Sequence, residues 1–379
     1  MKSLEIDPSA FLVDGGEWTA REIAQQPAVW EQALAEGAVG DVATWIGDAL
    51  GDPGTRVVFT GAGTSAYIGD SLAPVVSRRW GRTVEAVPTT DLVAAPRFVF
   101  PADVPTLLVS FARSGNSPES VAAVDIADAL LPHCRHLVIT CNAEGALAAA
   151  AARRSNARLL VLPACTNDRA FAMTSSFTTM LLVAARVFGV VEAAPAASGA
   201  DAIRRGAGVA RELVDAGFDR IVYLGGNGLR GLAREAALKM LELTDGQVVA
   251  AHETPLGFRH GPKTIVNDAT LVVMFISNDP LVRAYDLDLL RELRTDGRAR
   301  RVFAIGGKAI DSGAGVDLVI DGLEDKDEFG TIAPFVTVAQ LLALRRSGSL
   351  GLTPDQPSRS GTVNRVVQGV VIHGLAAGN

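Results

Sequence analysis

The sequence has few cysteines, no basic tract and no long apolar run. Its three cysteines, Cys134, Cys141 and Cys165, lack CxxC spacing and lie in strand-like or apolar segments. This favours buried thiols in a reducing compartment over disulfides or metal ligands. No apolar run approaches about 18 residues, and the acidic start, MKSLEIDPSAF, lacks the apolar core of a secretion signal. We therefore expect a cytoplasmic protein that neither crosses a membrane nor is secreted.

Several ligand-binding motifs are missing as well. The net charge of −7 and the absence of an aromatic-interleaved basic stripe argue against nucleic acid as a partner. Neither GxxxxGK[ST] nor GxGxxG with an acidic residue about 20 positions later occurs, which disfavours a nucleotide. The five histidines show no HxH or HExxH spacing, so we predict no metal and no cofactor.

What the sequence does contain is a repeat. VVFTGAG at Val57–Gly63 corresponds to IVYLGGN at Ile221–Asn227, and TLLVSF at Thr106–Phe111 corresponds to TLVVMF at Thr270–Phe275, each pair at an offset of 164 residues. Short β-rich runs alternate with helical stretches in both copies. This pattern predicts an α/β fold with two tandem, doubly wound parallel sheets.

The expected organisation has four parts. They are an N-terminal helical segment (1–36), a first α/β domain (37–192), a second α/β domain (200–346) and a C-terminal arm (347–379), with Ala193–Gly199 as the linker. Expected strands are Arg56–Thr60, Pro105–Ala112, His136–Asn142 and Leu159–Leu162, then Arg220–Leu224, Thr270–Ile276, Arg301–Ile305 and Leu318–Ile320. Expected helices are Thr19–Leu34, Ala170–Val190, Leu229–Leu243 and Phe329–Arg346, with others that begin near Ser65, Pro118 and Gly145.

Hydroxyl-rich loops follow two strands of the first copy. Loops after neighbouring parallel strands meet at the carboxyl edge of the sheet, where free N–H groups at helix starts favour an anion. The sequence therefore predicts a monophosphate site there, and the second copy has Gly228-Leu229 and Ser277-Asn278-Asp279 instead. The alternative for the first loop is a tight turn with Ser65 as a helix cap. The residues expected to hold the phosphate are Gly63, Thr64, Ser65, Arg113, Ser114 and Ser117, with Ser117 at an N-cap before Pro118.

The second copy carries a charged stripe on one helix. Glu235, Lys239 and Glu242 fall at i, i+4 and i+7 and occupy an arc of roughly 60°. Leu232 and Leu238 flank this arc, which indicates a helix face that lines a cleft and perturbs the pKa values of its members. The alternative is an exposed i,i+4 ion pair.

Two histidines lie in the segment AHETPLGFRHGPK, which we interpret as a loop. His260, between Arg259 and Gly261, is the candidate acid or base near neutral pH. His133 and His136 are expected at the surface or in the core.

Together these motifs resemble the two sugar isomerase (SIS) domains of glucosamine–fructose-6-phosphate aminotransferase. GAGTS, the SGNS loop, the EAALKMLE helix and the RHGP loop carry the resemblance, in order and spacing, over most of residues 20–379. SFARSGNSPES and ETPLGFRHGP are most similar to the galactosamine-6-phosphate deaminase group, also described as tagatose-6-phosphate ketose/aldose isomerases. The resemblance implies two flavodoxin-like SIS domains and a hexose or hexosamine 6-phosphate as substrate.

The resemblance also implies residue roles. Thr64, Ser65, Ser114 and Ser117 would hold the phosphate. Glu242 would move the proton between C1 and C2, beside Glu235 and Lys239. His260 would open the sugar ring from the neighbouring subunit, which implies a homodimer with shared active sites.

Differences from the aminotransferase qualify the reaction. No glutaminase domain with a catalytic cysteine is present, Ala112-Arg113 stands in place of Ser-Gln, and Thr362 stands in place of a lysine in the tail. Without an ammonia source, we expect deamination of galactosamine 6-phosphate or glucosamine 6-phosphate to a ketohexose 6-phosphate. A tagatose-6-phosphate isomerase without amine loss and a non-catalytic sugar-phosphate-binding regulator are the alternatives. The motifs do not distinguish galacto from gluco substrates, and they do not indicate whether the arm closes over the site.

Overall fold

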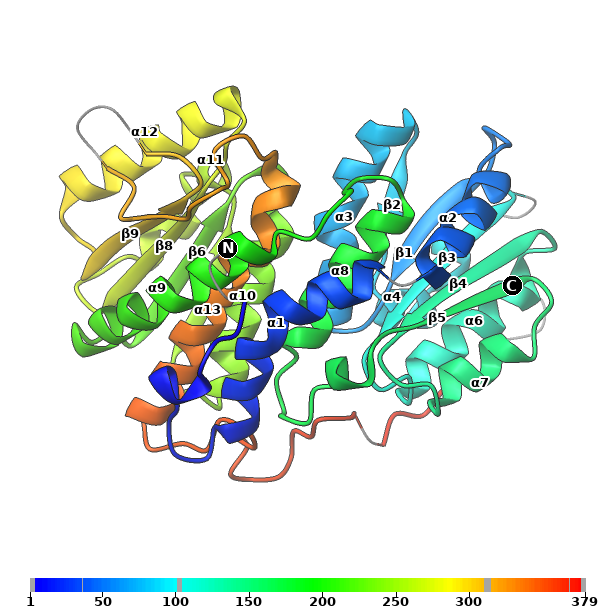
Figure 1. Ribbon diagram of the computed structural model, residues 1–379, viewed down its shortest axis with the longest axis horizontal. Helices are drawn as coiled ribbons and strands as arrows, with labels where there is room; N and C mark the ends of the chain where they lie inside the picture. The colour runs from blue at the N-terminus through cyan, green and yellow to red at the C-terminus, as the bar shows by residue number, and fades with distance from the viewer. Residues whose placement is uncertain (1–3, 36, 101–103, 310–314, 368, 376–379) are drawn as a thin grey trace. The chain divides into compact units, whose positions relative to one another are not determined.

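The chain folds into two compact units, each built on one parallel sheet (Figure 1). The computed structural model describes residues 4–35, 37–100, 104–309, 315–367 and 369–375. The first-copy unit comprises Gln32–Asn167, Ser176–Ala193 and Val363–Asn379, and the second-copy unit comprises Met1–Glu31, Asp168–Ser175 and Ala194–Thr362. The predicted fold class, two tandem parallel α/β sheets, is confirmed.

The first-copy sheet has the strand order β2-β1-β3-β4-β5. Its strands are β1 (Arg56–Thr60), β2 (Val84–Ala86), β3 (Thr106–Ala112), β4 (Cys134–Thr140) and β5 (Ala157–Val161). The helices are α2 (Gly37–Ala49), α3 (Thr64–Trp80), α4 (Thr89–Ala94), α5 (Pro96–Val99), α6 (Pro118–Leu130), α7 (Ala146–Ala152) and α8 (Ser175–Val187), with the 3-10 turn η2 (Ala164–Thr166). The strand β2 lies on one side of β1 and β3 lies on the other. The carboxyl ends of β1 and β3 therefore form the topological switch point, where open α/β sheets bind ligands.

The second-copy sheet repeats that order as β7-β6-β8-β9-β10. Its strands are β6 (Arg220–Gly225), β7 (Val249–Glu253), β8 (Thr270–Ile276), β9 (Arg301–Gly306) and β10 (Leu318–Val319). The helical segments are η1 (Pro8–Phe11), α1 (Glu17–Ala35), α9 (Ala196–Asp215), η3 (Asn227–Leu229), α10 (Arg230–Leu243), α11 (Pro255–Phe258), η4 (Pro262–Ile265), α12 (Pro280–Asp296) and α13 (Glu328–Ser349). None of the helices described is long and apolar enough to span a bilayer.

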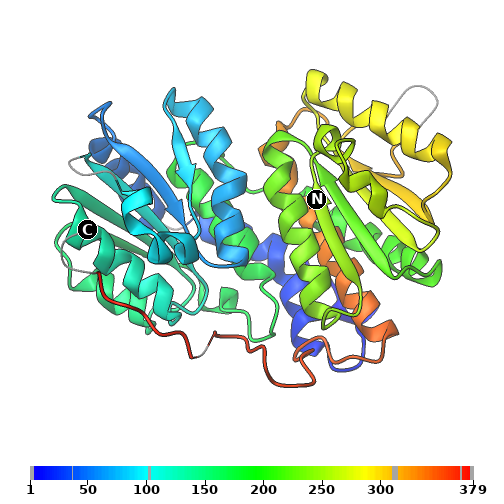
Figure 2. The same cartoon turned by 180° about the vertical axis from the view of Figure 1, so that it is seen from behind.

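Both sheets are covered on two faces, which explains their continuous apolar strands. In β8 every residue is buried. Met274 packs in a core cluster with Leu290 of α12, while Phe275 stacks on Phe335 of α13 with ring centroids 6.2 Å apart. Figure 2 shows both sheets and the helices that cover them from behind.

Some predicted boundaries are wrong. The strands β2 and β7 were not expected, and α8 begins at Ser175 rather than at Ala170. The expected linker Ala193–Gly199 is partly helical, because α9 begins at Ala196. The segment consists of six small residues and one proline, which is typical of a linker. Gly199 nevertheless packs so closely on Trp30 that a Cβ there would lie 2.3 Å from the ring. Tertiary packing therefore overrides the local composition.

The C-terminal arm caps the first turn of α1. The carboxylate of Asp355 accepts hydrogen bonds from the N–H groups of Trp18 at 2.9 Å and Thr19 at 2.8 Å, and from the Thr19 hydroxyl at 2.7 Å. The carbonyl of Asp355 accepts from the N–H of Phe171 at 3.0 Å. One residue thus joins three segments that are far apart in the sequence.

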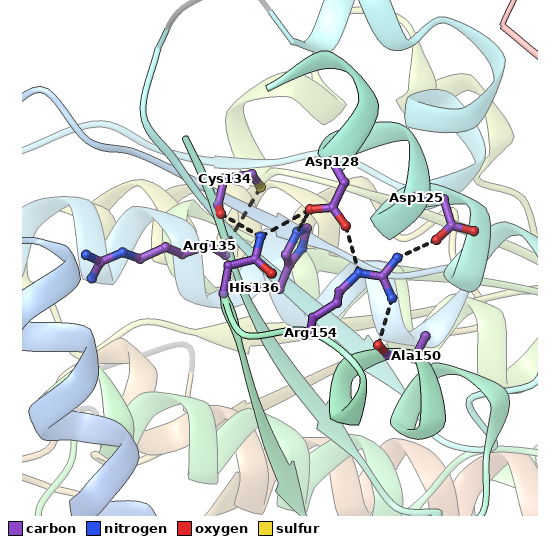
Figure 3. A network of polar contacts seen from close by, with 8 residues as sticks. Asp125, Asp128, Cys134, Arg135, His136, Ala150 and Arg154 are labelled. Atoms are coloured by element: carbon purple, nitrogen blue, oxygen red, sulfur yellow. Dashed lines mark hydrogen bonds and ion pairs between the residues drawn. The ribbon is translucent and has the colours of Figure 1, made fainter. Parts of the chain in front are cut away.

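An ionic network around the buried His136 lies at the amino end of β4 (Figure 3). Asp128 of α6 contacts Nε2 of His136 at 2.8 Å and Nε of Arg154 at 2.7 Å, and Arg154 also reaches Asp125 at 2.5 Å. Burial lowers the pKa of His136 even though Asp128 opposes this shift. His136 is buried and His133 is exposed, so both lie where the sequence placed them, at the surface or in the core.

The cysteines agree in part with the prediction. Cys134 and Cys141 are buried, and burial raises the pKa of the Cys134 thiol to about 12. Cys165 is exposed, so its predicted burial is wrong. It lies in the η2 turn after β5 rather than in an apolar strand.

Candidate functional site

The turn after β1 is shaped by two glycines. A Cβ on Gly61 would lie 2.6 Å from the carbonyl of Ser65, so the backbone can approach this closely only at glycine. Gly63 occupies the N-cap position of α3 with a φ of 56°. Thr64 and Ser65, the first two residues of the helix, are buried at 3% and 4% exposure. The alternative of Ser65 as the helix cap is therefore wrong.

The turn after β3 is held from both sides. Gly115 has a φ of 65°, and the side-chain amide of Asn142 donates to the Ser114 carbonyl at 2.9 Å. Asn116 Oδ1 accepts from the N–H of Ala146 at 2.9 Å, at the start of α7. The loop is thus fixed in place by neighbouring strand ends, as a preorganised site requires.

Ser117 occupies the N-cap position of α6 and Pro118 is its first residue, so that prediction is confirmed. The Ser117 hydroxyl does not cap the backbone. It lies 2.6 Å from the hydroxyl of Ser120. A hydroxyl pair can rotate to donate to an added acceptor.

Arg113 brings a buried cation to the end of β3. Arg113 is 7% exposed, and its Nη2 donates to the carbonyl of Arg365 at 2.6 Å. Arg365 in turn donates to Asn167 Oδ1 at 2.9 Å. The segment after Val363, red in Figure 2, therefore packs beside the end of β3 within the first-copy unit.

Two of the three charged residues in the α10 stripe are buried. Glu235 and Lys239 have no exposed side-chain surface, and the Glu242 side chain is 23% exposed. Lys239 Nζ lies 3.5 Å from Glu235 Oε1 and also contacts Glu242 Oε2. The alternative of an exposed ion pair is therefore wrong. A lysine between two carboxylates, of which only one reaches solvent, is suited to proton transfer at the exposed end.

The segment with the two histidines is more structured than predicted. Val249–Glu253 forms the edge strand β7, and α11 and η4 follow it, so the expectation of a continuous loop is wrong. His252 on β7 and His260 are both exposed. Gly261 has a φ of 119°, which favours glycine in the turn.

The turn that carries His260 is anchored to α12. Arg259 lies 2.7 Å from Glu292, and Lys263 contacts Glu292 and lies 2.5 Å from Asp296. These contacts hold the pKa of Glu292 below its usual range and raise that of Lys263. The histidine is thus presented to solvent on a segment that is held from both sides.

The chain resembles known proteins over nearly its whole length. Residues 52–188 match the SIS domain family. The chain is 46% identical over 369 residues to D-galactosamine-6-phosphate deaminase AgaS of Escherichia coli, covering 94% of this chain and 96% of that protein. The chain belongs to the AgaS family of SIS-domain proteins. The predicted family resemblance is thereby confirmed.

Solved structures agree with this membership. The crystal structure of tagatose-6-phosphate ketose/aldose isomerase from Escherichia coli matches with a TM-score of 0.88 and 40% identity, covering 98% of this chain and 100% of that one. The C-terminal domain of glucosamine-fructose-6-phosphate aminotransferase from Francisella tularensis matches with a TM-score of 0.75 and 17% identity, over 90% of this chain and 98% of that one. The latter similarity shows a shared fold.

Sequence analysis missed two carboxylates at the switch point of the second sheet. Asp286 of α12 accepts from the N–H of Ser277 at 2.9 Å, and Glu328 at the start of α13 is 8% exposed. Burial, opposed by the Ser277 bond and aided by Glu328, raises the pKa of Asp286 to about 7. One signal in the sequence could have pointed to this place. The strands Thr106–Phe111 and Thr270–Phe275 are alike, but the loops that follow them differ, with SGNS in the first copy and Ser277-Asn278-Asp279 in the second.

Proposed function

We propose that the chain is an enzyme that converts galactosamine 6-phosphate or glucosamine 6-phosphate to a ketohexose 6-phosphate and ammonia. The observation that carries the proposal is 46% identity across 94% of the chain with a galactosamine-6-phosphate deaminase. The buried Glu235 and Lys239 beside the partly exposed Glu242 support a catalyst over a sugar-phosphate-sensing regulator. Buried charges cost stability, and perturbed charged groups cluster at functional sites.

In this proposal the first-copy loops bind the phosphate. Gly63, Thr64 and Ser65 lie at the start of α3, and Ser114 and Ser117 follow β3. Arg113 adds positive charge beside them. Charge-assisted bonds of this kind contribute roughly 1.5–3 kcal/mol each.

The chemistry requires only acid–base groups. His260 assists ring opening to the aldehyde, and Glu242 removes the proton at C2 and returns it to C1. In the same conversion O1 takes up a proton and the amine nitrogen gives one up. The product is an imine at C2, which water hydrolyses to the ketone and ammonia. Lys239, beside Glu242, stabilises the charge that develops on oxygen.

A tagatose-6-phosphate ketose/aldose isomerase is the second candidate, favoured by the solved structure of that name at 40% identity. One experiment separates the two functions. The purified protein is assayed for ammonia release from galactosamine 6-phosphate and glucosamine 6-phosphate, and for isomerisation of tagatose 6-phosphate. Isomerisation with no ammonia from either amino sugar would exclude the deaminase.

Ser65→Ala and Ser114→Ala are each expected to raise KM for the sugar phosphate by roughly 10- to 100-fold, because each removes one charge-assisted hydrogen bond to phosphate. Steady-state kinetics over a range of substrate concentrations measures the effect. Thermal unfolding of each variant establishes that the fold is retained.

Ser71→Ala is the matched control for the phosphate loops. Ser71 is buried in the same helix as Ser65, and its hydroxyl donates to the carbonyl of Tyr67 at 2.9 Å. Its KM should equal that of the parent. Unchanged KM in Ser65→Ala and Ser114→Ala would show that the phosphate binds elsewhere.

We further propose a homodimer in which His260 of one chain serves the Glu242 of its partner, as the aminotransferase resemblance implies. The exposed position of His260 on an anchored turn supports this arrangement. Mixing inactive His260→Ala and Glu242→Gln proteins under conditions of subunit exchange is then expected to restore activity, because heterodimers contain one intact site.

Statistical exchange should recover about one quarter of the parent activity, since half the dimers are mixed and each has one of two sites intact. Exchange is verified independently with two affinity tags. No recovery despite exchange, or a fully active monomer in sedimentation, would show that each chain completes its own site.

A further inference from the structure

The two switch points share one backbone shape. A Cβ on Gly225 would lie 2.4 Å from the carbonyl oxygen of Leu229, as tight an approach as that of Gly61 to Ser65. The residues two positions after these glycines both have a positive φ, which is 44° for Asn227 and 56° for Gly63. Asn227 follows Gly63 by the repeat offset of 164 residues. The second copy therefore retains the turn that the first copy uses to face an anion.

In the second copy a carboxylate of the chain fills this turn. Glu328 Oε2 accepts from the Asn227 side-chain amide at 2.7 Å and from the Gly228 N–H at 3.2 Å. Glu328 Oε1 accepts from the Ser277 hydroxyl at 2.6 Å. The three donors come from the ends of β6 and β8, which are adjacent in the sheet. A backbone N–H, an amide and a hydroxyl around one oxyanion make up a complete anion site.

The first copy has no acid at the corresponding place. Its closing helix, α8, starts Ser175-Ser176-Phe177-Thr178-Thr179, and α13 of the second copy starts Glu328-Phe329-Gly330-Thr331. Aligning the Phe-x-Thr patterns places Ser176 opposite Glu328. In this alignment the first copy has a short hydroxyl where the second has a carboxylate.

We propose that Glu328 is an internal anion that stands in the second copy for the phosphate bound by the first, and that its carboxylate positions α10. The comparison with phosphate rests on the function proposed above. The positioning role rests on chain geometry, because Asn227 and Gly228 belong to η3, which leads directly into α10 at Arg230. Glu328 is a positioning residue, since it acts on Glu235, Lys239 and Glu242 through that turn.

The test is chemical rescue of Glu328→Ala by formate, a carboxylate small enough for the vacated volume. Formate should raise the melting temperature of Glu328→Ala in a saturable manner, with chloride at equal ionic strength as the salt control. The kcat of Glu328→Ala should fall by roughly 10- to 100-fold, as a misplaced catalytic helix predicts, with KM little changed. Formate should recover part of that kcat.

Asp327→Ala is the matched control, because Asp327 also lies at the start of α13 and its carboxylate accepts from the Gly330 N–H at 2.9 Å. It should lose stability without gaining a formate response, and its kcat should match that of the parent. An equal formate effect on both variants and the parent, or an unaltered kcat in Glu328→Ala, overturns the proposal. The melting-temperature response needs no activity, so it tests the anion site even if the proposed function fails.

Glu328→Gln covers the case in which Glu328→Ala does not fold. Glutamine keeps one oxygen acceptor and the side-chain volume but removes the charge and the second acceptor. A reduced kcat with unchanged KM for sugar phosphate supports the positioning role. Parent kcat in this variant, with parent stability, overturns it.

Discussion

Glu242→Gln is expected to lower kcat by at least about 100-fold while substrate binding is retained. The substitution keeps the shape of the side chain and removes the base that moves the proton between C1 and C2. Glu242 is the member of the α10 stripe with exposed surface, at 23%, so it is the one able to meet a substrate. Turnover is measured by ammonia release, and proton transfer by solvent deuterium exchange at C1 and C2.

Glu212→Gln is the matched control for this result. Glu212 lies in the same unit on α9, and its side chain is 64% exposed. The same chemical change there should leave both kcat and deuterium exchange at parent values. If exchange continued at the parent rate in Glu242→Gln, a different group would have to carry the proton.

Lys239→Met is expected to lower the free energy of unfolding by about 3–5 kcal/mol, because it removes the cation from between two carboxylates. Methionine is close to lysine in length and leaves little empty volume, so the loss reports mainly on charge. Glu235, with no exposed side-chain surface, loses its ion pair with Lys239. Urea denaturation followed by circular dichroism measures the change.

Two further variants separate charge from packing. Arg230→Met makes the same type of change at an exposed position of α10 and should stay within about 0.5 kcal/mol of the parent. Glu235→Gln combined with Lys239→Met should lose less than the sum of the single variants, since the two residues interact directly. Additive losses would argue that the Glu235 and Lys239 charges are independent.

Sequence patterns predicted the central strands accurately. Thr270–Ile276 forms a strand with the expected bounds because it is buried on both faces and reads as one apolar run. The edge strand Val249–Glu253 was missed because its outer side is open and its residues are of mixed character. Val84–Ala86 was missed because three residues are too few to carry a pattern.

The candidate site was predictable where one element holds all the residues. The spacing of Glu235, Lys239 and Glu242 on one helix, with leucines on either side, correctly argued against an exposed ion pair, since Glu235 and Lys239 have no exposed side-chain surface. The role of Glu328 could not be read in this way. It meets Asn227 and Ser277 only after two strands and a closing helix come together, about 50 to 100 residues apart in sequence.

Asp355 also sets when α1 can be completed during synthesis. Its carboxylate bonds to Thr19 across 336 residues of chain. At about 5–20 residues per second, a ribosome takes roughly 20–70 seconds to cover that distance. Over this interval the first turn of α1 lacks its cap, and all five strands of the first-copy sheet, the last of which ends at Val161, are synthesised in the same period. Until Asp355 is synthesised, the N–H groups of Trp18 and Thr19 therefore lack the carboxylate that they contact in the folded protein.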